Sequence, residues 1–402
     1  MRPFDGRRVI LGVTGGIACY KAVTLARLLT QAGAVVEVIM SRAAREFVGA
    51  ITFEAVTGRA VAPAILDAGH ALAHIRLAKE AELVLIAPAT ADFLARAAGG
   101  RADDQMTAVL LATRAPVLVA PAMNDGMWSH ALVVRNVQLL RELGYEVLDP
   151  AVGPLAFGEG IGPGRLTEPE SIMAYAGRAL ETAKGLAGRN IVVTAGPTRE
   201  ALDPVRYITN HSSGRMGVAI AAAAWRRGAH VTLVHGPVDV ALPDGVLSVA
   251  VTTTNDMRDA VARVLPDADA LIMAAAPADF RAADISAQKI KKTDAAPSIA
   301  LQHTDDILTT TRALRKAGAV VMGFALETTN IETNARAKLS RKGLDFIIAN
   351  DATEAGAGFG TDTNRVVILS ADGTRETPPL MQKTDLADVL LDRIARTLER
   401  GA

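Results

Sequence analysis

Runs of consecutive apolar residues, each followed by small turn residues and then a helical pattern, recur along this chain. The run from Val9 to Val13 leads through Gly15-Gly16 into a helical pattern from Ile17 to about Gln31, and a second run follows from Val35 to Met40. Strands that are apolar at successive positions are typical of a parallel sheet with helices on both faces. The pattern therefore predicts an α/β protein built from βαβ units.

The pattern occurs in two series, which predicts two domains. The first series continues with strands at Leu83 to Ala87 and Val117 to Ala120, followed by helices from Ala91 to Ala98 and through Leu143. The second series contains the predicted strands Ile191 to Thr194, Val231 to His235, Leu271 to Ala275, Ala319 to Phe324 and Phe346 to Ala349. We expect two doubly wound, Rossmann-like domains, residues 1–184 and 190–402, which agrees with a length of 402 residues at roughly 150 per domain.

One stretch between these series, Asp149 to Arg165, interrupts the pattern. It contains five glycines and three prolines. Such a composition favours a long mobile loop, and loops of that length often act as active-site lids. Ligands of doubly wound sheets bind beyond the carboxyl ends of the strands, so this loop is expected near a site.

Charge and composition exclude several classes of function. Lys plus Arg and Asp plus Glu each number 43, and this zero net charge argues against a nucleic-acid partner held by phosphate contacts. Cys19 is the single cysteine, so neither an intrachain disulfide nor a thiolate zinc cluster can form. No apolar run approaches the roughly 20 residues that span a bilayer. We therefore expect a cytoplasmic protein that binds small molecules and has no membrane partner.

Small or polar residues follow the predicted strands of the first domain. Gly15-Gly16-Ile17-Ala18 precedes a helix, where backbone amides can approach a phosphate, although an ordinary tight turn has the same composition. Ser41 follows the second strand. Thr90-Ala91-Asp92-Phe93 follows the third strand and predicts either an anion pocket or a helix capped by Thr90.

Two further segments of the first domain carry side chains suited to catalysis. His74 begins a helix ahead of the strand at Leu83, where it is either a surface residue or an acid–base group. Met123 and Asn124 lie in Pro-Ala-Met-Asn-Asp-Gly-Met-Trp after the fourth strand. The asparagine could grip a carboxylate, and the methionines could wall a flat ring or simply pack in the core.

Anion-binding residues follow the strands of the second domain. Asn210 stands in Asn-His-Ser-Ser-Gly directly ahead of a helix, and Asp279 ends a run of small residues after the strand at Leu271. A carboxylate in that position suits a ribose hydroxyl, a base edge or a metal. Lys289 opens a basic quartet that is either a solvated surface or a clamp for a triphosphate. No Gly-x-x-x-x-Gly-Lys-Ser/Thr loop is present, which argues against a P-loop NTPase.

Taken together, these motifs resemble known families. Gly-Gly-Ile-Ala, His74 before a strand, Ala-Pro-Ala-Thr-Ala and Pro-x-Met-Asn-x-x-Met-Trp resemble the homo-oligomeric FMN-containing cysteine decarboxylase family over about residues 7 to 180. Asn-His-Ser-Ser-Gly, Ala-Ala-x-x-Asp-Phe and Lys-Ile-Lys-Lys resemble phosphopantothenate–cysteine ligase over roughly residues 188 to 400. The two occur fused, in this order, in the bifunctional coenzyme A biosynthesis family of bacteria.

The resemblance implies a flavodoxin-like decarboxylase domain that uses FMN and a ligase domain that uses CTP and Mg²⁺, in a homo-oligomer that is a dodecamer by family likeness. It implies catalytic roles for His74, Asn124, Asn210 and Lys289, and leaves the metal ligands unknown. The implied FMN contacts are Gly15, Gly16, Ile17, Ala18, Ser41, Thr90, Ala91, Asp92, Phe93 and Met123. The implied CTP contacts are Met273, Ala274, Ala275, Asp279, Lys289, Asp305, Asp306, Ile307, Leu308, Phe324, Lys338 and Lys342.

The sequence departs from the family at the predicted lid. There the family carries a proton-donating cysteine in Ala-Cys-Gly, whereas this chain has Leu155-Ala156-Phe157-Gly158-Glu159. Glu159, or water admitted by the lid, could supply that proton. Two alternatives therefore stay open: an active ligase with a silent or altered flavin domain, and an NAD-dependent two-domain oxidoreductase. The second would need a Gly-x-Gly-x-x-Gly turn, which the chain lacks.

Overall fold

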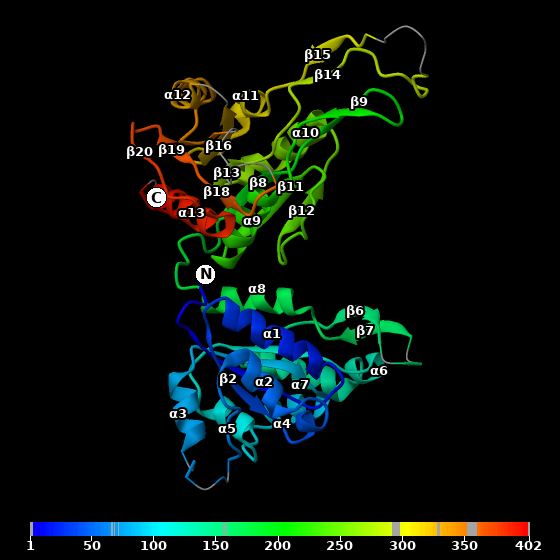
Figure 1. Cartoon of the computed structure of the whole chain (residues 1–402), viewed down its shortest axis with the longest axis vertical. Coiled ribbons are helices and arrows are strands. Elements are labelled where there is room, and N and C mark those ends of the chain that lie inside the picture. Colours follow the sequence, from blue (N-terminus) through cyan, green and yellow to red (C-terminus); the bar gives the residue numbers. More distant parts are fainter. Residues whose placement is uncertain are drawn as a thin grey trace. The chain divides into compact units, whose positions relative to one another are not determined.

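The computed structural model divides the chain into two compact units, Met1–Thr182 and Ala183–Ala402 (Figure 1). It describes residues 3–65, 67, 69–70, 72–155, 157–158, 160–291, 298–327, 330–351 and 360–400. In these ranges, no helix combines the length and hydrophobicity that crossing a bilayer requires.

A five-stranded parallel sheet forms the centre of the first unit. Its strand order is β2-β1-β3-β4-β5, and every neighbouring pair is parallel. The strands are β1 (Arg8–Val13), β2 (Val35–Met40), β3 (Leu83–Ala89), β4 (Val117–Pro121) and β5 (Glu146–Val147). All residues of β3 and β4 are buried, so helices cover both faces of the sheet, as the continuous apolar runs predict.

Two hydrophobic cores lie on the opposite faces of this sheet. Alternate residues of β1 point to opposite sides, so that Val9 and Leu11 join one core and Ile10 joins the other. The first core packs against α1 (Cys19–Gln31), α2 (Ala50–Thr57) and α8 (Pro169–Leu180). The second packs against α3 (Ala73–Glu80), α4 (Ala91–Ala98), α5 (Gln105–Ala112) and α7 (Ala131–Glu142). A short helix, α6 (Asp125–Trp128), precedes α7.

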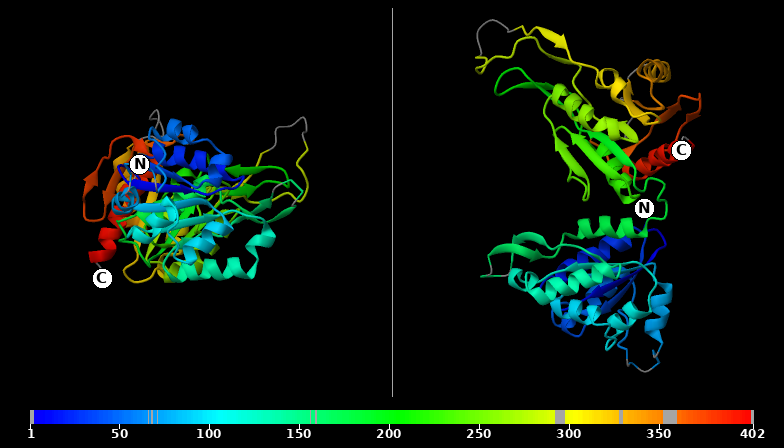
Figure 2. Two further views of the ribbon diagram at one scale, coloured as in Figure 1. Left: turned by 90° about the horizontal axis from the view of Figure 1, so that it is seen from below. Right: turned by 180° about the vertical axis from the view of Figure 1, so that it is seen from behind.

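The stretch from Asp149 to Arg165 is not the loop that its composition predicts. It folds as an antiparallel hairpin of β6 (Ala151–Pro154) and β7 (Ile161–Arg165). The prediction was wrong because glycine and proline weaken strand signals in a sequence, yet an exposed two-stranded hairpin needs few buried side chains. The hairpin projects from the same end of the unit as α6 (Figure 1; Figure 2, right).

The second unit is built on an eight-stranded sheet with the order β12-β11-β8-β13-β16-β17-β19-β20. Its first six strands are parallel: β12 (Leu247–Ala250), β11 (His230–His235), β8 (Asn190–Ala195), β13 (Ala270–Met273), β16 (Val320–Glu327) and β17 (Phe346–Asp351). The prediction of a wholly parallel sheet is corrected at one edge, where β19 (Val367–Ser370) and β20 (Arg375–Glu376) are antiparallel. A short hairpin can extend a sheet without a crossover helix.

Helices cover both faces of the second sheet as well (Figure 1). One face carries α10 (Thr254–Val264), α11 (Ile307–Thr310) and α12 (Ile331–Lys342), which share a core with alternate strand residues. The other carries α9 (Arg215–Arg226) and α13 (Lys383–Arg400). These two are joined by a buried ion pair in which Arg227 donates to Asp388 at 2.8 Å.

Three two-stranded ribbons lie outside the second sheet. They are β9 (Arg199–Ala201) with β10 (Tyr207–Thr209), β14 (Phe280–Ala282) with β15 (Leu301–His303), and β18 (Thr363–Asn364) with β21 (Met381–Gln382). The β14–β15 ribbon belongs to an arm that extends well away from the sheet (Figures 1 and 2).

Candidate active sites

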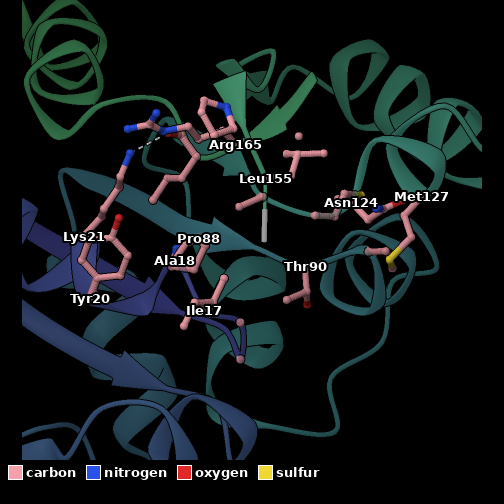
Figure 3. Close-up of a pocket in the computed structure, with 18 residues that line it drawn as sticks. Ile17, Ala18, Tyr20, Lys21, Pro88, Thr90, Asn124, Met127, Leu155 and Arg165 are labelled. Atoms are coloured by element: carbon pink, nitrogen blue, oxygen red, sulfur yellow. Dashed lines mark hydrogen bonds between the residues drawn. The ribbon is translucent and has the colours of Figure 1, made fainter. Parts of the chain in front are cut away.

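A cavity of about 620 Å³ opens at the carboxyl ends of β1, β3 and β4 in the first unit (Figure 3). Predicted cofactor and substrate contacts contribute eight of its lining residues: Gly15, Gly16, Ile17, Ala18, Thr90, Ala91, Met123 and Asn124. Its other lining residues are Tyr20, Lys21, Pro88, Ala122, Met127, Pro154, Leu155, Gly164, Arg165 and Leu166. The lining therefore combines backbone amides, apolar walls and two cationic side chains.

The floor of this first cavity is held by one hydroxyl group and one close backbone approach. The Thr14 hydroxyl donates to the Pro88 carbonyl at 2.7 Å and accepts from the Thr90 N–H at 2.9 Å, which ties the β1 and β3 turns together. A Cβ on Gly15 would lie 2.3 Å from the Ala43 Cβ, so only glycine fits. A Cβ on Gly16 would approach just Thr90 Cγ2, at 3.9 Å, on the open side of the turn. A bound group can therefore come close to the backbone at Gly16.

Asn124 and the hairpin form the roof of the first cavity. The Asn124 Oδ1 caps α6 by accepting from the Gly126 N–H at 2.8 Å, so the amide NH₂ is the donor that Asn124 offers to a ligand. The Met123 N–H donates to the Gly164 carbonyl at 2.9 Å. A Cβ on Gly164 would lie only 2.1 Å from the Met123 carbonyl oxygen. The glycines of β7 thus allow the hairpin to pack directly on the Asn124 turn.

A charged network that sequence reasoning missed lies at the opposite side of the cavity from Asn124 (Figure 3). The Lys21 ammonium is buried and donates to both oxygens of Glu168, at 2.9 and 3.0 Å. Arg165 donates to the same carboxylate at 2.9 Å. Two cations share one carboxylate, which leaves net positive charge beside the cavity. Lys21 gave no signal because a lysine in a helix is by default a surface residue.

A second cavity, of about 580 Å³, lies at the carboxyl ends of β13, β16 and β17 in the second unit. Predicted residues again contribute to it: Asn210, Ala274, Ala275, Asp279, Phe324, Lys338 and Lys342. Asp279 is the single carboxylate among the described residues that line it. The remaining lining residues include the start of α9, with Arg215, and a polar corner formed by Asn350, Asn364 and Lys383.

Close backbone contacts shape the anion-binding side of this second cavity. Gly214 has a φ of +73° and precedes α9, and a Cβ there would lie 2.3 Å from Val238 Cγ1. Gly214 and the first residues of α9, Arg215 and Met216, line the cavity, where helix amides favour an anion. Asn210 donates from Nδ2 to the Pro277 carbonyl at 2.8 Å and thereby ties the α9 loop to the β13 loop.

Comparisons with known proteins match nearly the whole chain. The family described as "Flavoprotein" matches residues 2–180, and the family described as "DNA/pantothenate metabolism flavoprotein C-terminal domain" matches residues 186–398. The coenzyme A biosynthesis bifunctional protein CoaBC of Vibrio vulnificus is 43% identical over 98% of both chains, and that of Mycolicibacterium smegmatis is 46% identical over 98% of both. The chain belongs to the bifunctional coenzyme A biosynthesis family.

Solved structures include relatives of each half of this family member. A crystal structure of the C-terminal domain of a coenzyme A biosynthesis bifunctional protein is 38% identical, with a TM-score of 0.47, and covers 54% of this chain and 99% of that chain. A phosphopantothenoylcysteine decarboxylase mutant is 27% identical, with a TM-score of 0.39, and covers 42% and 96%. Neither alternative predicted from the sequence, the ligase with a silent flavin domain or the NAD-dependent oxidoreductase, finds support in the comparisons.

Some predicted residues of the flavin-binding half do not line its cavity. The Phe93 side chain is fully buried in the core, and Asp92 is exposed and paired with Arg96 at 3.0 Å. The Ser41 hydroxyl instead accepts from the Ala44 N–H at 3.1 Å. Phe157 is fully exposed, and Glu159 lies outside the described residues.

His74 also lies away from the first cavity. Its helix, α3, is at the opposite end of the unit from α6 and the hairpin, in Figure 1 and in the view from behind in Figure 2. The His74 Nδ1 is buried and has no hydrogen-bond partner among the described residues. One copy of the chain therefore does not bring His74 and Asn124 together.

In the ligase half of this family member, Asp306 is the one residue of the segment from Asp305 to Leu308 that pairs with a side chain lining the second cavity. Ile307 and Leu308 are core side chains, and Asp305 pairs with Arg258. Asp306 pairs with the cavity-lining Lys342 at 3.0 Å. Burial alone would raise the pKa of Asp306, but the hydrogen bond and charge of Lys342 and the Thr309 N–H outweigh it and lower that pKa.

Two other predicted CTP contacts also lie outside the second cavity. Met273 is buried beneath it and accepts weakly from the Thr194 hydroxyl at 3.7 Å. Lys289 is exposed on the β14–β15 arm and does not line the cavity. Lys292, the last residue of the basic quartet, lies outside the described residues.

Proposed function

We propose that the second unit joins 4′-phosphopantothenate to cysteine with CTP, through an acyl cytidylate, and that the first unit decarboxylates the product to 4′-phosphopantetheine with FMN. One observation carries the proposal: Asn210, Asp279 and Lys342, far apart in the sequence, line a single cavity, as ligation requires. The family membership of both halves supports the same pair of reactions.

The first cavity fits FMN. The open turn at Gly16 and the start of α1 offer backbone amides to a phosphate, and Thr90 adds a hydroxyl. Ile17 and Met123 supply apolar walls for a flat ring. Bound FMN would supply reversible two-electron redox chemistry. The chain's own contribution is to hold the substrate carboxylate on the Asn124 amide and to exclude water beneath the hairpin.

The second cavity fits a nucleoside triphosphate. Lys338 and Lys342 bring positive charge to its α12 side, where the triphosphate would lie. A carboxylate needs activation because its oxygen is a poor leaving group. Attack of the carboxylate on the α-phosphorus of CTP would release pyrophosphate and make CMP the leaving group of the next step. Asp279 is placed to hold the nucleotide or, through one carboxylate ligand, Mg²⁺, which keeps most of its waters and binds phosphates. The described residues contain no cluster of three metal-ligating side chains, so the phosphates and water would provide the other ligands.

We also propose that the protein works as a homo-oligomer. His74 and Lys289 each stand away from the cavity of their own unit, and a second copy can supply both. The apolar side chains exposed on the first unit, which include Ile17, Tyr20 and Ile51, suit burial against such copies. The dodecamer remains the assembly that family likeness implies.

The pair of reactions is tested with the purified full-length chain, 4′-phosphopantothenate, cysteine, CTP and Mg²⁺. We expect pyrophosphate, CMP, CO₂ and 4′-phosphopantetheine in equal amounts. Pyrophosphate release without any CO₂ would leave a ligase alone, and no pyrophosphate would refute the ligase assignment.

The shared decarboxylase site is tested by mixing two inactive variants, His74→Asn and Asn124→Asp. If each site takes His74 from one copy and Asn124 from another, random co-assembly at equal amounts restores about a quarter of the sites. The two variants must be unfolded and refolded together so that subunits exchange. Assembly without recovery of CO₂ release would show that both residues come from one copy.

The lid poses a separate question, because Phe157 has no exchangeable proton. We expect wild type to release saturated 4′-phosphopantetheine, with Glu159 or water as the proton donor. The masses of anaerobic products from wild type, Glu159→Gln and Phe157→Cys decide this. A product two mass units lighter from wild type, corrected by Phe157→Cys, would show that the lid lacks a donor.

A further inference from the structure

The polar corner of the second cavity, formed by Asn350, Asn364 and Lys383, has no role in binding CTP as argued above. It lies beyond β17 on the side of the sheet that α9 and α13 cover, whereas Lys338 and Lys342 belong to α12 on the other side. All three corner residues are at least nine-tenths buried, although asparagine and lysine are mostly surface residues. Burial of this kind needs specific partners.

The corner is a built structure. Asn350 donates from Nδ2 to Asn364 Oδ1 at 2.7 Å. Asn364 is fixed by the pairing of β18 with β21, and Lys383 follows β21 directly. The backbone N–H of Lys383 donates to the Asp362 carbonyl at 2.8 Å, and its ammonium donates to the Thr361 carbonyl at 2.5 Å. These bonds hold the side chains in fixed positions.

The corner offers an acceptor and positive charge together. The Asn350 amide nitrogen donates to Asn364, which leaves the Asn350 Oδ1 as an acceptor for other groups. The Asn350 Oδ1 has no hydrogen-bond partner among the described residues. Lys383 and Arg215 bring two cations, and Arg215 pairs with the exposed Asp362. Burial and the charge of Arg215 lower the pKa of Lys383, against an opposing effect of Asp362. An anion bound beside Lys383 would offset both of the lowering effects.

We infer that this corner is the subsite for the amino-acid nucleophile of the ligase. The Asn350 Oδ1 accepts an N–H of the α-amine, and Lys383 with Arg215 binds the α-carboxylate. A short α-amino acid presents both groups on one carbon atom, which matches an acceptor and cations gathered in one corner. A phosphate arm would suit the cations but not the acceptor oxygen. The inference rests on the proposed ligase function.

The subsite serves the second half of the ligation. The neutral amine attacks the acyl carbon of the cytidylate, a C–N bond forms, the C–O bond to CMP breaks, and the amine loses one proton to solvent. Formation of the acyl cytidylate and release of pyrophosphate precede this step and do not need the amino acid. Damage to the corner should therefore spare pyrophosphate release and slow the amine-dependent step.

The test compares two nucleophiles, cysteine and cysteamine, in the full-length enzyme. Cysteamine has the amine and the thiol but no carboxylate. We expect Lys383→Met to lower kcat/KM for cysteine by about ten- to hundred-fold, as for loss of a charged hydrogen bond, and to change that for cysteamine little. Asn350→Ser should lower kcat/KM for both amines. Lys316→Met, which removes an ion pair with Asp269 at the amino-terminal ends of the strands, away from the cavity, is the matched control.

The outcomes separate the possibilities. Loss of pyrophosphate release in Lys383→Met, measured without amino acid, would show that the corner binds another substrate or supports the fold, and would overturn the inference. Equal losses for cysteine and cysteamine in Lys383→Met would overturn it too. If Lys383→Met does not fold, Asn350→Ser decides, because an unchanged KM for cysteine there refutes the subsite. A wild type that releases no pyrophosphate refutes the proposed ligase function itself.

Discussion

Replacing Gly164 with alanine should disable the decarboxylase half through a single methyl group. The new Cβ would lie 2.1 Å from the Met123 carbonyl oxygen, whereas such contacts are essentially never under 3.0 Å, so the strand must shift by about 0.9 Å or more. That shift strains or breaks the 2.9 Å hydrogen bond from Met123 to Gly164. Overpacking and the lost bond together cost about 2–4 kcal/mol.

The functional effect should exceed the loss of stability, because Asn124 follows Met123 directly. A displacement of about 1 Å in a substrate-positioning group costs roughly a hundred-fold in rate. CO₂ release from 4′-phosphopantothenoylcysteine measures this, and pyrophosphate release by the other half of the same sample should be unchanged. Flavin fluorescence during heating reports the stability of the first unit.

Gly158→Ala is the matched control in the same hairpin. Gly158 has a φ of +86° and nothing within 4 Å of its added Cβ, so it should lose only about 1–2 kcal/mol to its left-handed backbone. A wild-type rate of decarboxylation in Gly164→Ala, or an equal loss of activity in both variants, would contradict this role of Gly164.

Three further predictions concern charged residues. Lys21→Met should destabilise the first unit by about 1–3 kcal/mol, seen as a lower flavin-release temperature, because a buried cation that holds Glu168 is lost; an unchanged temperature would refute this. Asp279→Ala should slow CTP-dependent pyrophosphate release at least tenfold and leave CO₂ release from added 4′-phosphopantothenoylcysteine intact. A wild-type rate of pyrophosphate release would exclude the carboxylate from the CTP site. Because the pKa of Asp306 is lower in the folded state than in the unfolded state, the ionised carboxylate stabilises the fold at pH values above the unfolded-state pKa of about 3.9. That stabilisation is lost as the pH falls through the folded-state pKa. Asp306→Asn should therefore unfold at lower urea than wild type at pH 7, with the difference shrinking toward pH 3, and a constant difference would contradict the assignment.

The inner parallel strands of both sheets could be predicted because their apolar runs reflect one local cause, burial on two faces. The strands β5, β12, β19 and β20 were not predicted, because they are short and lie at or beside the sheet edges, where no long apolar run marks them. The hairpin from Ala151 to Arg165 could not, because its glycines serve contacts that no local pattern records. Gly162 lies against the Asp125 side chain and Gly164 against the Met123 carbonyl, both from a segment earlier in the chain. A sequence shows that such glycines are flexible and does not show what approaches them.

The candidate sites could be predicted in part for the same reason. Parallel strands place their carboxyl ends at one edge, so position made Thr90, Asn124 and Asp279 candidates for sites, and the family resemblance then assigned them roles. Lys21 and Lys383 lie on helices, and distant partners that include the Glu168 side chain and the Thr361 carbonyl hold them inward. Pairing between distant segments leaves no periodic trace in a single sequence.

The expectation that site residues follow the carboxyl ends of the strands has a limit that bears on assembly. It accounts for residues that follow a strand, and it fails for His74, on the helix before β3, and for Lys289, on an arm that leaves the sheet. Both are polar residues that the family likeness assigns to catalysis, and neither lines the cavity of its own unit. If one copy were sufficient, a separate rearrangement in each domain would have to bring them to the cavities. In the proposed homo-oligomer, a second copy would supply each residue without such a rearrangement and would cover the apolar side chains that the first unit exposes, so assembly would account for both observations with a single cause.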